Sequence, residues 1–509
     1  MEIISNLIKS AIEIGSKFQN SKDGEEAQKE VLKELLEKAK KTSFGTYYDF
    51  SSILEDKELV KKFQKEVPFH NYDQIYEKWW CKSYEGKPNI CWPGTVKFFA
   101  VSSGTTSRSK HIPVTTEMQE SIRNGGVQQI LGLSNFKDLP DTFYDKEILM
   151  LGSSTNLKEV DDHLEGEISG ISAYNIPNWF SKFYKPGAKI SAIDDWDDRV
   201  EEIAKEAKNW DIGSLSGIPS WIELMLQKVI DHHQVDNIHE IWPNLSVYTS
   251  GGVALEPYKK SFDKLFGKPV QYIDTYLASE GYLATQMRPD TDAMQLLIDN
   301  GVFYEFVPFK PEHMTPDGAI AQDAPALTLS EVEENEEYIL VISTVTGAWR
   351  YMIGDTITFT DKKRHEIKIT GRTKFFLNVV GSQLSVNKMD EAISKINDEF
   401  EINVKEFTVS AVREKDDYIH HWYLGVEDMS VKPDIQKLTR FLDDCLKDNN
   451  KNYKVARDKA LKDVKVSVVD VAKFLEWNDA TKKKGGQVKI AKVMKEEDFK
   501  EWEDFVHSA

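Results

Sequence analysis

The interpretation of this chain starts from one stretch, Val96-Lys97-Phe98-Phe99-Ala100-Val101-Ser102-Ser103-Gly104-Thr105-Thr106-Ser107-Arg108-Ser109-Lys110. Its first part is mostly apolar, which predicts a buried strand. The second part carries hydroxyl side chains, one glycine and a lysine. Such a loop can hold a polyphosphate, because backbone N–H groups and hydroxyls donate to phosphate oxygens while the lysine adds positive charge. A hydroxyl-rich surface turn has the same composition, so the assignment depends on the motifs that follow.

The length and charge of the chain limit its class. At 509 residues it is too long for one small core, which predicts two or more domains. The net charge of −19 argues against nucleic-acid binding and against adhesion to anionic membranes. A hydrophobic content of 40% is typical of a folded enzyme and not of a disordered chain.

The cysteines and the N-terminus indicate the compartment. Cys81, Cys91 and Cys445 are sparse, odd in number and without CxxC spacing, which predicts neither a zinc site nor a disulfide framework. The sequence from Met1 lacks the features of a signal peptide, and no run of 18 apolar residues predicts a membrane span. We therefore expect a cytoplasmic protein, and we expect it to be a monomer that binds neither nucleic acid nor membrane.

The pattern of apolar residues predicts an α/β fold. Residues 1–66 have helical periodicity, and strand-like and helix-like segments alternate after residue 67. The strand-like segments are 147–151, 245–249 and 270–276, and the helix-like segments are 200–210, 221–233 and 259–266. Between residues 294 and 369, five strand-like runs predict an antiparallel or barrel-like region. After residues 371–374 the order strand, helix, strand, strand, helix, strand predicts a compact α+β unit of its own.

The loop at residues 102–110 resembles the phosphate loop of the acyl-adenylate-forming enzymes, the luciferase and acyl-ligase superfamily. Ser107 and Ser109 stand where that pattern usually has Gly and Pro. The resemblance implies nucleotide contacts by Ser102, Ser103, Gly104, Thr105, Thr106 and Lys110.

Two motifs downstream resemble the nucleotide motifs of the same superfamily. Ser250, Gly251 and Gly252 follow a predicted strand and resemble the turn that contacts adenine; a plain tight turn is the alternative. The segment from Tyr276 to Glu280 resembles a motif whose glutamate holds Mg²⁺ and whose hydroxyl, here Ser279, touches phosphate. A carboxylate oxygen suits Mg²⁺, although an ordinary surface acid would also fit, and Leu277 replaces the usual Gly.

Two more motifs imply ribose contacts. Tyr351-Met352-Ile353-Gly354-Asp355 resembles the segment whose aspartate accepts hydrogen bonds from the ribose hydroxyls. Gly371-Arg372-Thr373-Lys374 resembles the hinge of the superfamily, in which Arg372 also reaches the ribose and Lys374 occupies the pivot position. The alternatives are a turn aspartate and a surface cation in a hairpin.

A glycine-rich loop near the C-terminus carries the candidate catalytic lysine. Gly485-Gly486-Gln487-Val488-Lys489 resembles the loop in which the superfamily places that lysine, so Lys489 is the expected match, with Lys482, Lys483 and Lys484 as competitors. The resemblance implies Lys489, Glu280 and Thr105 as catalytic residues and Glu280 as the metal ligand.

Three other segments narrow the resemblance to one family. Residues 67–72, 301–308 and 347–351 look like the auxin-responsive acyl-acid amido synthetases, and the chain looks like a divergent, microbial member. The family uses ATP and Mg²⁺ to join a carboxylic acid, such as an auxin, to the amine of an amino acid through an acyl-adenylate. The implied architecture is a large N-terminal domain of residues 1–372 and a small mobile C-terminal domain of residues 375–509, with a hinge near 371–374.

Several alternatives remain open in the sequence. An acyl-CoA ligase of the same superfamily shares the adenylation step and differs only in its nucleophile, and a non-catalytic nucleotide-binding protein could use the same fold. The base that deprotonates the amine is not identified; His111, His163 and the pair His232-His233 are candidates by residue type only. Aromatic residues within 174–184 and 303–309 line an acyl pocket or, more commonly, pack in the core.

Overall fold

The structure is a computed structural model that describes residues 24–102, 110–136, 139–178, 180–252, 255, 258–315, 318–373, 384, 386–414, 417–450, 453–454, 457, 461–481, 491–494 and 496–507. These residues form two compact units. The first unit takes its residues from 24–353 and 358–368, and the second from 354–357 and 369–507.

One 11-stranded sheet forms the centre of the fold, with the order β12-β13-β14-β15-β11-β10-β9-β8-β7-β3-β6. The strands β9, β8, β7, β3 and β6 run parallel to one another. Their bounds are Gln271–Ala278, Val247–Gly251, Ile212–Gly217, Glu147–Leu151 and Tyr184–Lys185. The carboxyl ends of these parallel strands therefore meet at one edge of the sheet.

The predicted antiparallel region continues the same sheet. Pairing of β10 with β9 and β11, of β11 with β15, and of β12 with β13 is antiparallel. All five predicted strand runs between residues 294 and 369 are present. The bounds here are Gly281–Thr285 (β10), Met294–Leu296 (β11), Val302–Pro308 (β12), Glu337–Thr344 (β13), Tyr351–Asp361 (β14) and Glu366–Arg372 (β15).

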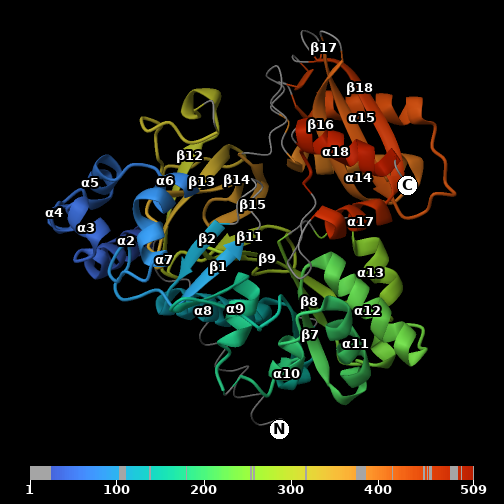
Figure 1. The fold of residues 1–509 in the computed structure, drawn as a ribbon, viewed down its shortest axis with the longest axis horizontal. Helices are drawn as coiled ribbons and strands as arrows, with labels where there is room; N and C mark the ends of the chain where they lie inside the picture. Colours follow the sequence, from blue (N-terminus) through green and yellow to red (C-terminus); the bar gives the residue numbers. More distant parts are fainter. Residues whose placement is uncertain are drawn as a thin grey trace. The chain divides into compact units, whose positions relative to one another are not determined.

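Three helices cover the parallel strands (Figure 1, green). They are α11 (Trp196–Glu206), α12 (Pro219–His233) and α13 (Lys259–Leu265). The apolar face of α12 follows helical spacing, and its residues pack with the strand side chains in one hydrophobic core. Each such side chain taken from water stabilises the fold by about 1.5–3 kcal/mol. The buried members on α12 are Ile222, Met225, Leu226, Val229 and Ile230.

A second sheet of the first unit holds the two ends of the candidate phosphate loop. Its order is β2-β1-β5-β4, with bounds Lys110–Val114, Phe98–Ser102, His163–Gly166 and Lys158–Val160. Helix α8 (Thr116–Gly132) follows β2, and Thr115 caps it by accepting a hydrogen bond from the Met118 amide at 3.0 Å. The sequence prediction missed β2, β4, β5, β7 and α8.

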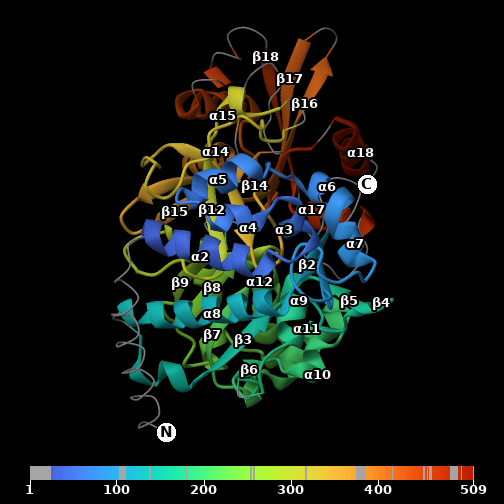
Figure 2. The same ribbon diagram turned by 90° about the vertical axis from the view of Figure 1, so that its left-hand side faces the viewer.

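The N-terminal helices pack on the antiparallel half of the large sheet (Figure 2, blue). Helix α2 (Gly24–Ala39) lies on β12, and its buried Gln28 amide donates to the carbonyl of Val302 and accepts from the amide of Tyr304. The described part of the predicted helical region at residues 1–66 is confirmed. It continues with α3 (Ser43–Tyr47), α4 (Phe50–Leu54), α5 (Leu59–Glu66), α6 (Tyr72–Ile75), a π-helix (Tyr76–Trp80) and α7 (Cys81–Tyr84).

A buried ion pair joins these helices to the sheet. The guanidinium of Arg350, just before β14, lies 3.0–3.1 Å from the carboxylate of Glu305 on β12, and both side chains are almost fully buried. Arg350 Nη1 donates to the carbonyls of Gln64 and Val67 at 2.7 and 2.8 Å. The cation therefore also satisfies carbonyl groups at the C-terminal end of α5, which have no partner within the helix. The Cζ atom of Arg350 lies over the ring of Phe69, 3.9 Å from the ring centroid.

The second unit is a three-stranded sheet between helices. The strands β16 (Val404–Glu414) and β17 (Asp417–Val426) are antiparallel, and β18 (Leu461–Asp470) is parallel to β17. Helices α14 (Val386–Phe400) and α15 (Ile435–Asn449) contribute to one hydrophobic core, and α17 (Ala472–Thr481) and α18 (Glu496–His507) to another. The predicted order helix, strand, strand, helix, strand is confirmed, although α17 and α18 were not predicted. The strand predicted between residue 374 and α14 falls almost entirely outside the described residues. The predicted boundary near 371–374 stays a prediction.

Short elements complete the fold. They are α9 (Ile168–Tyr174), α10 (Ala188–Ser191) and the 3-10 helices Leu133–Asn135, Asp141–Asp145, Ala207–Asn209, Ile238–Glu240 and Pro311–His313. Cys81, Cys91 and Cys445 are free, so the prediction that they form no disulfide framework is confirmed.

Replacing Arg350 with methionine should destabilise the protein by about 3–5 kcal/mol, because it leaves the carboxylate of Glu305 buried and unpaired. The measurement is the free energy of unfolding in urea. The double variant Glu305→Gln/Arg350→Met should lose less free energy of unfolding than the sum of the losses in the two single variants. Lys61→Met, which removes a fully exposed ion pair with Glu58, is the control and should leave stability unchanged. A loss for Arg350→Met no larger than that of the control would contradict the assignment.

Candidate functional site

The predicted adenine turn lies at the carboxyl end of β8. Strand β8 extends two residues further than predicted, so Ser250 and Gly251 are its last residues, and Gly252 follows with a φ of +85°. A Cβ atom on Gly251 would lie 2.8 Å from Thr275 Oγ1, which itself donates to the Ser250 carbonyl. The close approach of β8 and β9 at residue 251 therefore favours glycine there.

The predicted Mg²⁺ motif lies on the neighbouring strand. Tyr276 is in β9, and Ala278 pairs with Gly281, which makes Ser279 and Glu280 the two residues of a tight hairpin turn to β10. Glu280 is only 6% exposed, so it is not the ordinary surface acid that the sequence left open. Because β8 and β9 are adjacent and parallel, the glycine turn and this hairpin meet at the carboxyl edge of the sheet, where α/β proteins commonly bind ligands.

The structure describes the two ends of the candidate phosphate loop. Ser102 and Lys110 face each other as the last pair of the β1–β2 hairpin, while Ser103, Gly104, Thr105 and Thr106 lie outside the described residues. Lys110 Nζ lies 5.3 Å from the ring centroid of Tyr72. The hydroxyl of Tyr72 accepts the amide of His111 at 2.8 Å, which ties the start of β2 to α6.

Helix α8 links this hairpin to the strands that carry the other motifs. Gln129 donates to Thr249 Oγ1 on β8 at 2.8 Å and accepts from the hydroxyl of Tyr282 on β10 at 2.9 Å. Close packing supports the same contact, because a Cβ atom on Gly125 would lie 2.5 Å from the Tyr282 ring. The chain that leaves the phosphate loop is thereby attached to both strands that flank β9.

The two predicted ribose ligands form an ion pair within the second unit. Arg372 Nε donates to Asp355 Oδ1 at 2.7 Å, with the Asp355 side chain 7% exposed and that of Arg372 47% exposed. Asp355 lies within strand β14, so it is not the turn residue of the alternative interpretation. Gly354 has a φ of +97°, which favours glycine, and its carbonyl accepts the amide of Thr373 at 2.8 Å. This contact holds Asp355 and Arg372 in register.

The family-like segments at 67–72 and 347–351 are hydrogen-bonded to each other. The amide of His70 donates to the carbonyl of Arg350, and the amide of Met352 donates to the carbonyl of His70. The His70 ring nitrogen Nδ1 lies 2.9 Å from the carbonyl of Trp349. Burial lowers the pKa of His70 from 6.5 to about 4, so the imidazole is neutral in the folded protein at neutral pH.

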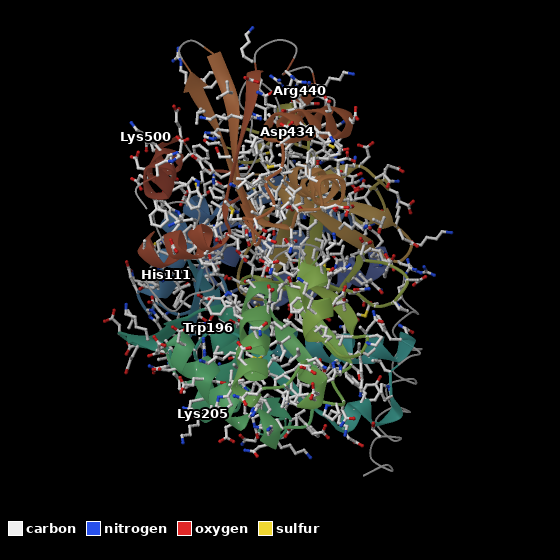
Figure 3. The ribbon with its side chains drawn as sticks, turned by 90° about the vertical axis from the view of Figure 1, so that its right-hand side faces the viewer. His111, Trp196, Lys205, Asp434, Arg440 and Lys500 are labelled. Carbon is white, nitrogen blue, oxygen red and sulfur yellow. The ribbon has the colours of Figure 1, made fainter. Side chains whose placement is uncertain are left out.

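The sequence missed the residue that organises the candidate histidines. Glu165 on β5 is buried and accepts a hydrogen bond from the Tyr84 hydroxyl at 2.6 Å. His111 Nδ1 lies 3.0 Å and His163 Nε2 3.5 Å from the same carboxylate oxygen; Figure 3 labels His111. Burial acts to raise the pKa of Glu165, but the Tyr84 hydrogen bond and His111 outweigh it, and the pKa is lowered. The carboxylate stays ionised and can orient an imidazole.

The remaining candidates divide as follows. Lys374, Lys482–Lys484 and Lys489 lie outside the described residues. His232 and His233 lie at the end of α12, and His233 Nε2 lies 2.8 Å from the Ala204 carbonyl. In the part of the chain that the structure describes, no three His, Cys, Asp or Glu side chains group as a metal site. Within the same ranges, no helix has the length and apolar character to cross a membrane.

Comparison with protein families gives three matches in order along the chain. The GH3 family N-terminal domain matches residues 17–196, the GH3 family central domain 295–372, and the GH3 family C-terminal domain 386–498. Together these matches cover well over half of the sequence and include the candidate phosphate loop, Asp355 and Arg372.

Curated plant proteins are similar over shorter stretches. "Indole-3-acetic acid-amido synthetase GH3.3" of Arabidopsis thaliana is 25% identical over 271 residues, 50% of this chain and 44% of that protein. "Indole-3-acetic acid-amido synthetase GH3.8" of Oryza sativa subsp. indica is 26% identical over 167 residues, 31% of this chain and 26% of that protein. The matched stretch spans less than half the length of these relatives.

Solved structures share the fold. The structure of "GH3.15 acyl acid amido synthetase" has a TM-score of 0.78 at 14% identity and covers 98% of this chain and 96% of its own. That of "2-Hydroxyisobutyryl-CoA Ligase (HCL) in the postadenylation state in complex with 2-HIB-AMP" has a TM-score of 0.58 at 12% identity, with 95% and 92% coverage. The large unit and the smaller unit are thus those of the predicted superfamily fold.

Lowering the pH should destabilise the folded protein, because His70 is buried in its neutral form. Its pKa is about 4 when folded and 6.5 in the unfolded chain, so the unfolded state binds more protons between these values. Stability from this group is complete above pH 6.5 and is lost as the pH falls to 4, by about 3 kcal/mol. Urea unfolding of wild type and His70→Gln at pH 7 and pH 4 measures the difference. His232→Gln, at an exposed position of α12, is the control. An equal pH dependence in wild type and His70→Gln would refute the prediction.

Proposed function

The chain belongs to the GH3 family, and from this premise we propose that it is an ATP-dependent acyl-acid amido synthetase. It would adenylate a small carboxylic acid, such as an auxin, and transfer the acyl group to the amine of an amino acid. The observation that carries the proposal is the order of the three family matches along a chain in which the candidate phosphate loop, the glycine turn and the Glu280 hairpin each follow the end of a strand. The names of the plant relatives support the same reaction type.

The first half-reaction activates the acid. A carboxylate oxygen attacks the α-phosphorus of ATP, the bond from that phosphorus to the bridging oxygen breaks, and pyrophosphate leaves. We propose that the loop at 102–110, with Ser102, Thr105 and Lys110, holds the departing phosphates. Lys489 would neutralise charge that builds up at the α-phosphate, a type of stabilisation that dominates phosphoryl-type chemistry.

The nucleotide contacts follow from the strand ends. Ser250, Gly251 and Gly252 would place bare backbone against the adenine, with Tyr276 and Ser279 on the next strand. Asp355 would accept hydrogen bonds from the ribose hydroxyls, and its ion pair with Arg372 fixes both side chains in advance. The position of Ser250 and Gly251 at the carboxyl end of β8, beside the hairpin that carries Ser279, supports the adenine assignment.

Glu280 is the proposed Mg²⁺ ligand. It is a buried carboxylate in a turn whose backbone is fixed by strand pairing, and a hard oxygen donor suits this ion. Mg²⁺ takes few protein ligands because it keeps water and phosphate oxygens, and when bound it would offset the negative charge of the phosphates.

The second half-reaction forms the amide. The amine nitrogen attacks the acyl carbon, the bond from that carbon to the phosphate oxygen breaks, and AMP leaves; a base takes the proton of the amine. We also propose a division into residues 1–372 and 375–509 with a hinge near 371–374, around Lys374, which would bring Lys489 to the nucleotide for the first step only. The protein would act as a cytoplasmic monomer on small molecules alone.

The test is a screen of carboxylic acids with ATP and Mg²⁺, each combined with the twenty amino acids and with CoA. Pyrophosphate release and mass spectrometry of the products are measured. An amide with an amino acid supports the proposal. A CoA thioester without amide would identify an acyl-CoA ligase instead, and nucleotide binding without pyrophosphate release would identify a binding protein.

The same screen tests the catalytic lysine. Lys489→Ala should lower pyrophosphate release by about 10²–10³-fold, by analogy with the loss of one group that stabilises a transition-state charge. ATP binding, measured by calorimetry, should be nearly unchanged. Lys482→Ala is the matched control from the neighbouring lysine cluster and should retain full activity. Normal pyrophosphate release by Lys489→Ala would refute its role.

Removing the proposed ribose ligand should weaken nucleotide binding. Asp355→Ala should raise the KM for ATP by about 10–100-fold, because hydrogen bonds to a charged group contribute about 1.5–3 kcal/mol. The KM for the carboxylic acid should stay within about twofold. Asp361→Ala, at the other end of β14, is the control and should leave both constants unchanged. An unchanged KM for ATP in Asp355→Ala would remove this residue from the site.

A further inference from the structure

Helix α11 carries a buried cation that the proposed mechanism does not use. Arg199 is only 2% exposed, yet its Nε and Nη1 atoms have no hydrogen-bond partner among the residues that the structure describes. Its Cζ atom lies 5.4 Å from the centroid of the Trp196 ring. Buried polar groups are nearly always satisfied in folded proteins, and a buried charge without partners is costly, so this side chain needs an explanation.

Nearby carboxylates do not supply the missing hydrogen bonds. Asp194, Asp195 and Glu167 are close enough to act on the charge of Arg199, but burial has the larger effect and lowers its pKa. Asp194 accepts from Ser154 and Asn156, Glu167 accepts from Ser153, and Asp195 caps α11. Within the described residues, Arg199 forms no ion pair with any of them. The guanidinium stays charged, because its intrinsic pKa is far above neutrality.

The surroundings of Arg199 place it at the carboxyl edge of the large sheet. Ser153 and Ser154, which bind the carboxylates of Glu167 and Asp194, lie just after the end of β3. The Trp196 ring contacts Trp221 at 3.8 Å between ring centroids, and Trp221 lies in the first turn of α12, the helix that follows β7. Figure 3 labels Trp196 and Lys205 at the two ends of α11. Gly217 at the end of β7 pairs with Ser250 at the end of β8. Since neighbouring strands are about 4.8 Å apart, Arg199 lies a few strands from the proposed adenine turn.

The chemistry of a guanidinium selects an anion with two oxygens. Its planar fork matches a carboxylate with two parallel hydrogen bonds, and burial next to Trp196 strengthens such a pair by excluding water. The proposed reaction offers two carboxylates. The carboxylate of the acyl acid loses its charge when the adenylate forms, so pairing with it would leave Arg199 without a partner after the first step. The α-carboxylate of the acceptor amino acid keeps its charge throughout.

We propose that Arg199 binds the α-carboxylate of the acceptor amino acid, an inference that rests on the proposed function. The carboxylates of Glu167 and Asp194, which act on the charge of Arg199, complete a charge pattern complementary to a zwitterion, which carries an ammonium group beside its carboxylate. Trp196 is half-buried and Asp194 exposed, so the cation lies close to the surface of the first unit. The acceptor subsite is thus formed by the ends of β3 and β7 and the start of α11.

The experiment compares each amino acid with its carboxamide as acceptor, in wild type, Arg199→Met and Arg199→Lys. Wild type should prefer the acid, and Arg199→Met should lower kcat/KM for the acid by about 100-fold while kcat/KM for the carboxamide changes little. Arg199→Lys keeps the positive charge but lacks the planar fork of the guanidinium. Its kcat/KM for the acid should therefore lie between the values for wild type and Arg199→Met. Lys205→Met, an exposed cation on the same helix, is the control and should behave as wild type.

Exchange of pyrophosphate into ATP with the carboxylic acid alone reports adenylation and serves as the test of folding. It should be unchanged in Arg199→Met. If Arg199→Met does not fold, Arg199→Lys serves as the test variant. The ratio of kcat/KM for the amino acid to kcat/KM for its carboxamide is then compared between Arg199→Lys and wild type. A ratio equal to that of wild type overturns the proposal, and so does an effect confined to the KM of the acyl acid in the exchange assay.

Failure of the proposed function gives a different result. In that case wild type shows neither exchange nor amide with any acid. Calorimetric titration of wild type and Arg199→Met with the twenty amino acids and their carboxamides then tests Arg199 directly. Binding of the acid form that is lost in Arg199→Met supports the subsite, and equal binding by both proteins overturns it.

Discussion

The fold of the first unit depends on the buried ion pair between Glu305 and Arg350. Because each charge would be costly alone, strands β12 and β14 and the end of α5 can pack together only in the arrangement that pairs them. The backbone carbonyl of Arg350 also accepts a hydrogen bond from the amide of His70. The pair thus fixes where β14 begins.

The parallel half of the sheet supplies the other constraint. Strands that run parallel end at one edge, so residues far apart in sequence meet there. Ser250 and Glu280 lie 30 residues apart and reach neighbouring strand ends in this way. Tight packing adds precision: the hydroxyl of Thr275 leaves room for glycine alone at residue 251.

Sequence patterns predicted this architecture where periodicity and burial agree. The strand at 147–151 has the predicted bounds, and the helix at 221–233 begins only two residues earlier, at Pro219. Helix α8 was missed because Gly125 and Gly126 interrupt its pattern, although the first of them is needed for contact with Tyr282. Glu165 was missed because β5 has only four residues, and its importance comes from contacts with Tyr84 on α7, His111 on β2 and His163 on its own strand. No local pattern reports such a cluster.

Arg199 and Arg350, both buried in the first unit, show how structure separates a scaffold residue from a binding residue. Both are charged residues that a sequence alone would assign to a solvated face. Arg350 meets a carboxylate and two backbone carbonyls, which accounts for its burial within the protein. Arg199 has comparable burial and an aromatic neighbour but lacks acceptors among the described residues. Since the same chain satisfies one guanidinium completely, the difference at the other is best explained by an acceptor that arrives with a ligand.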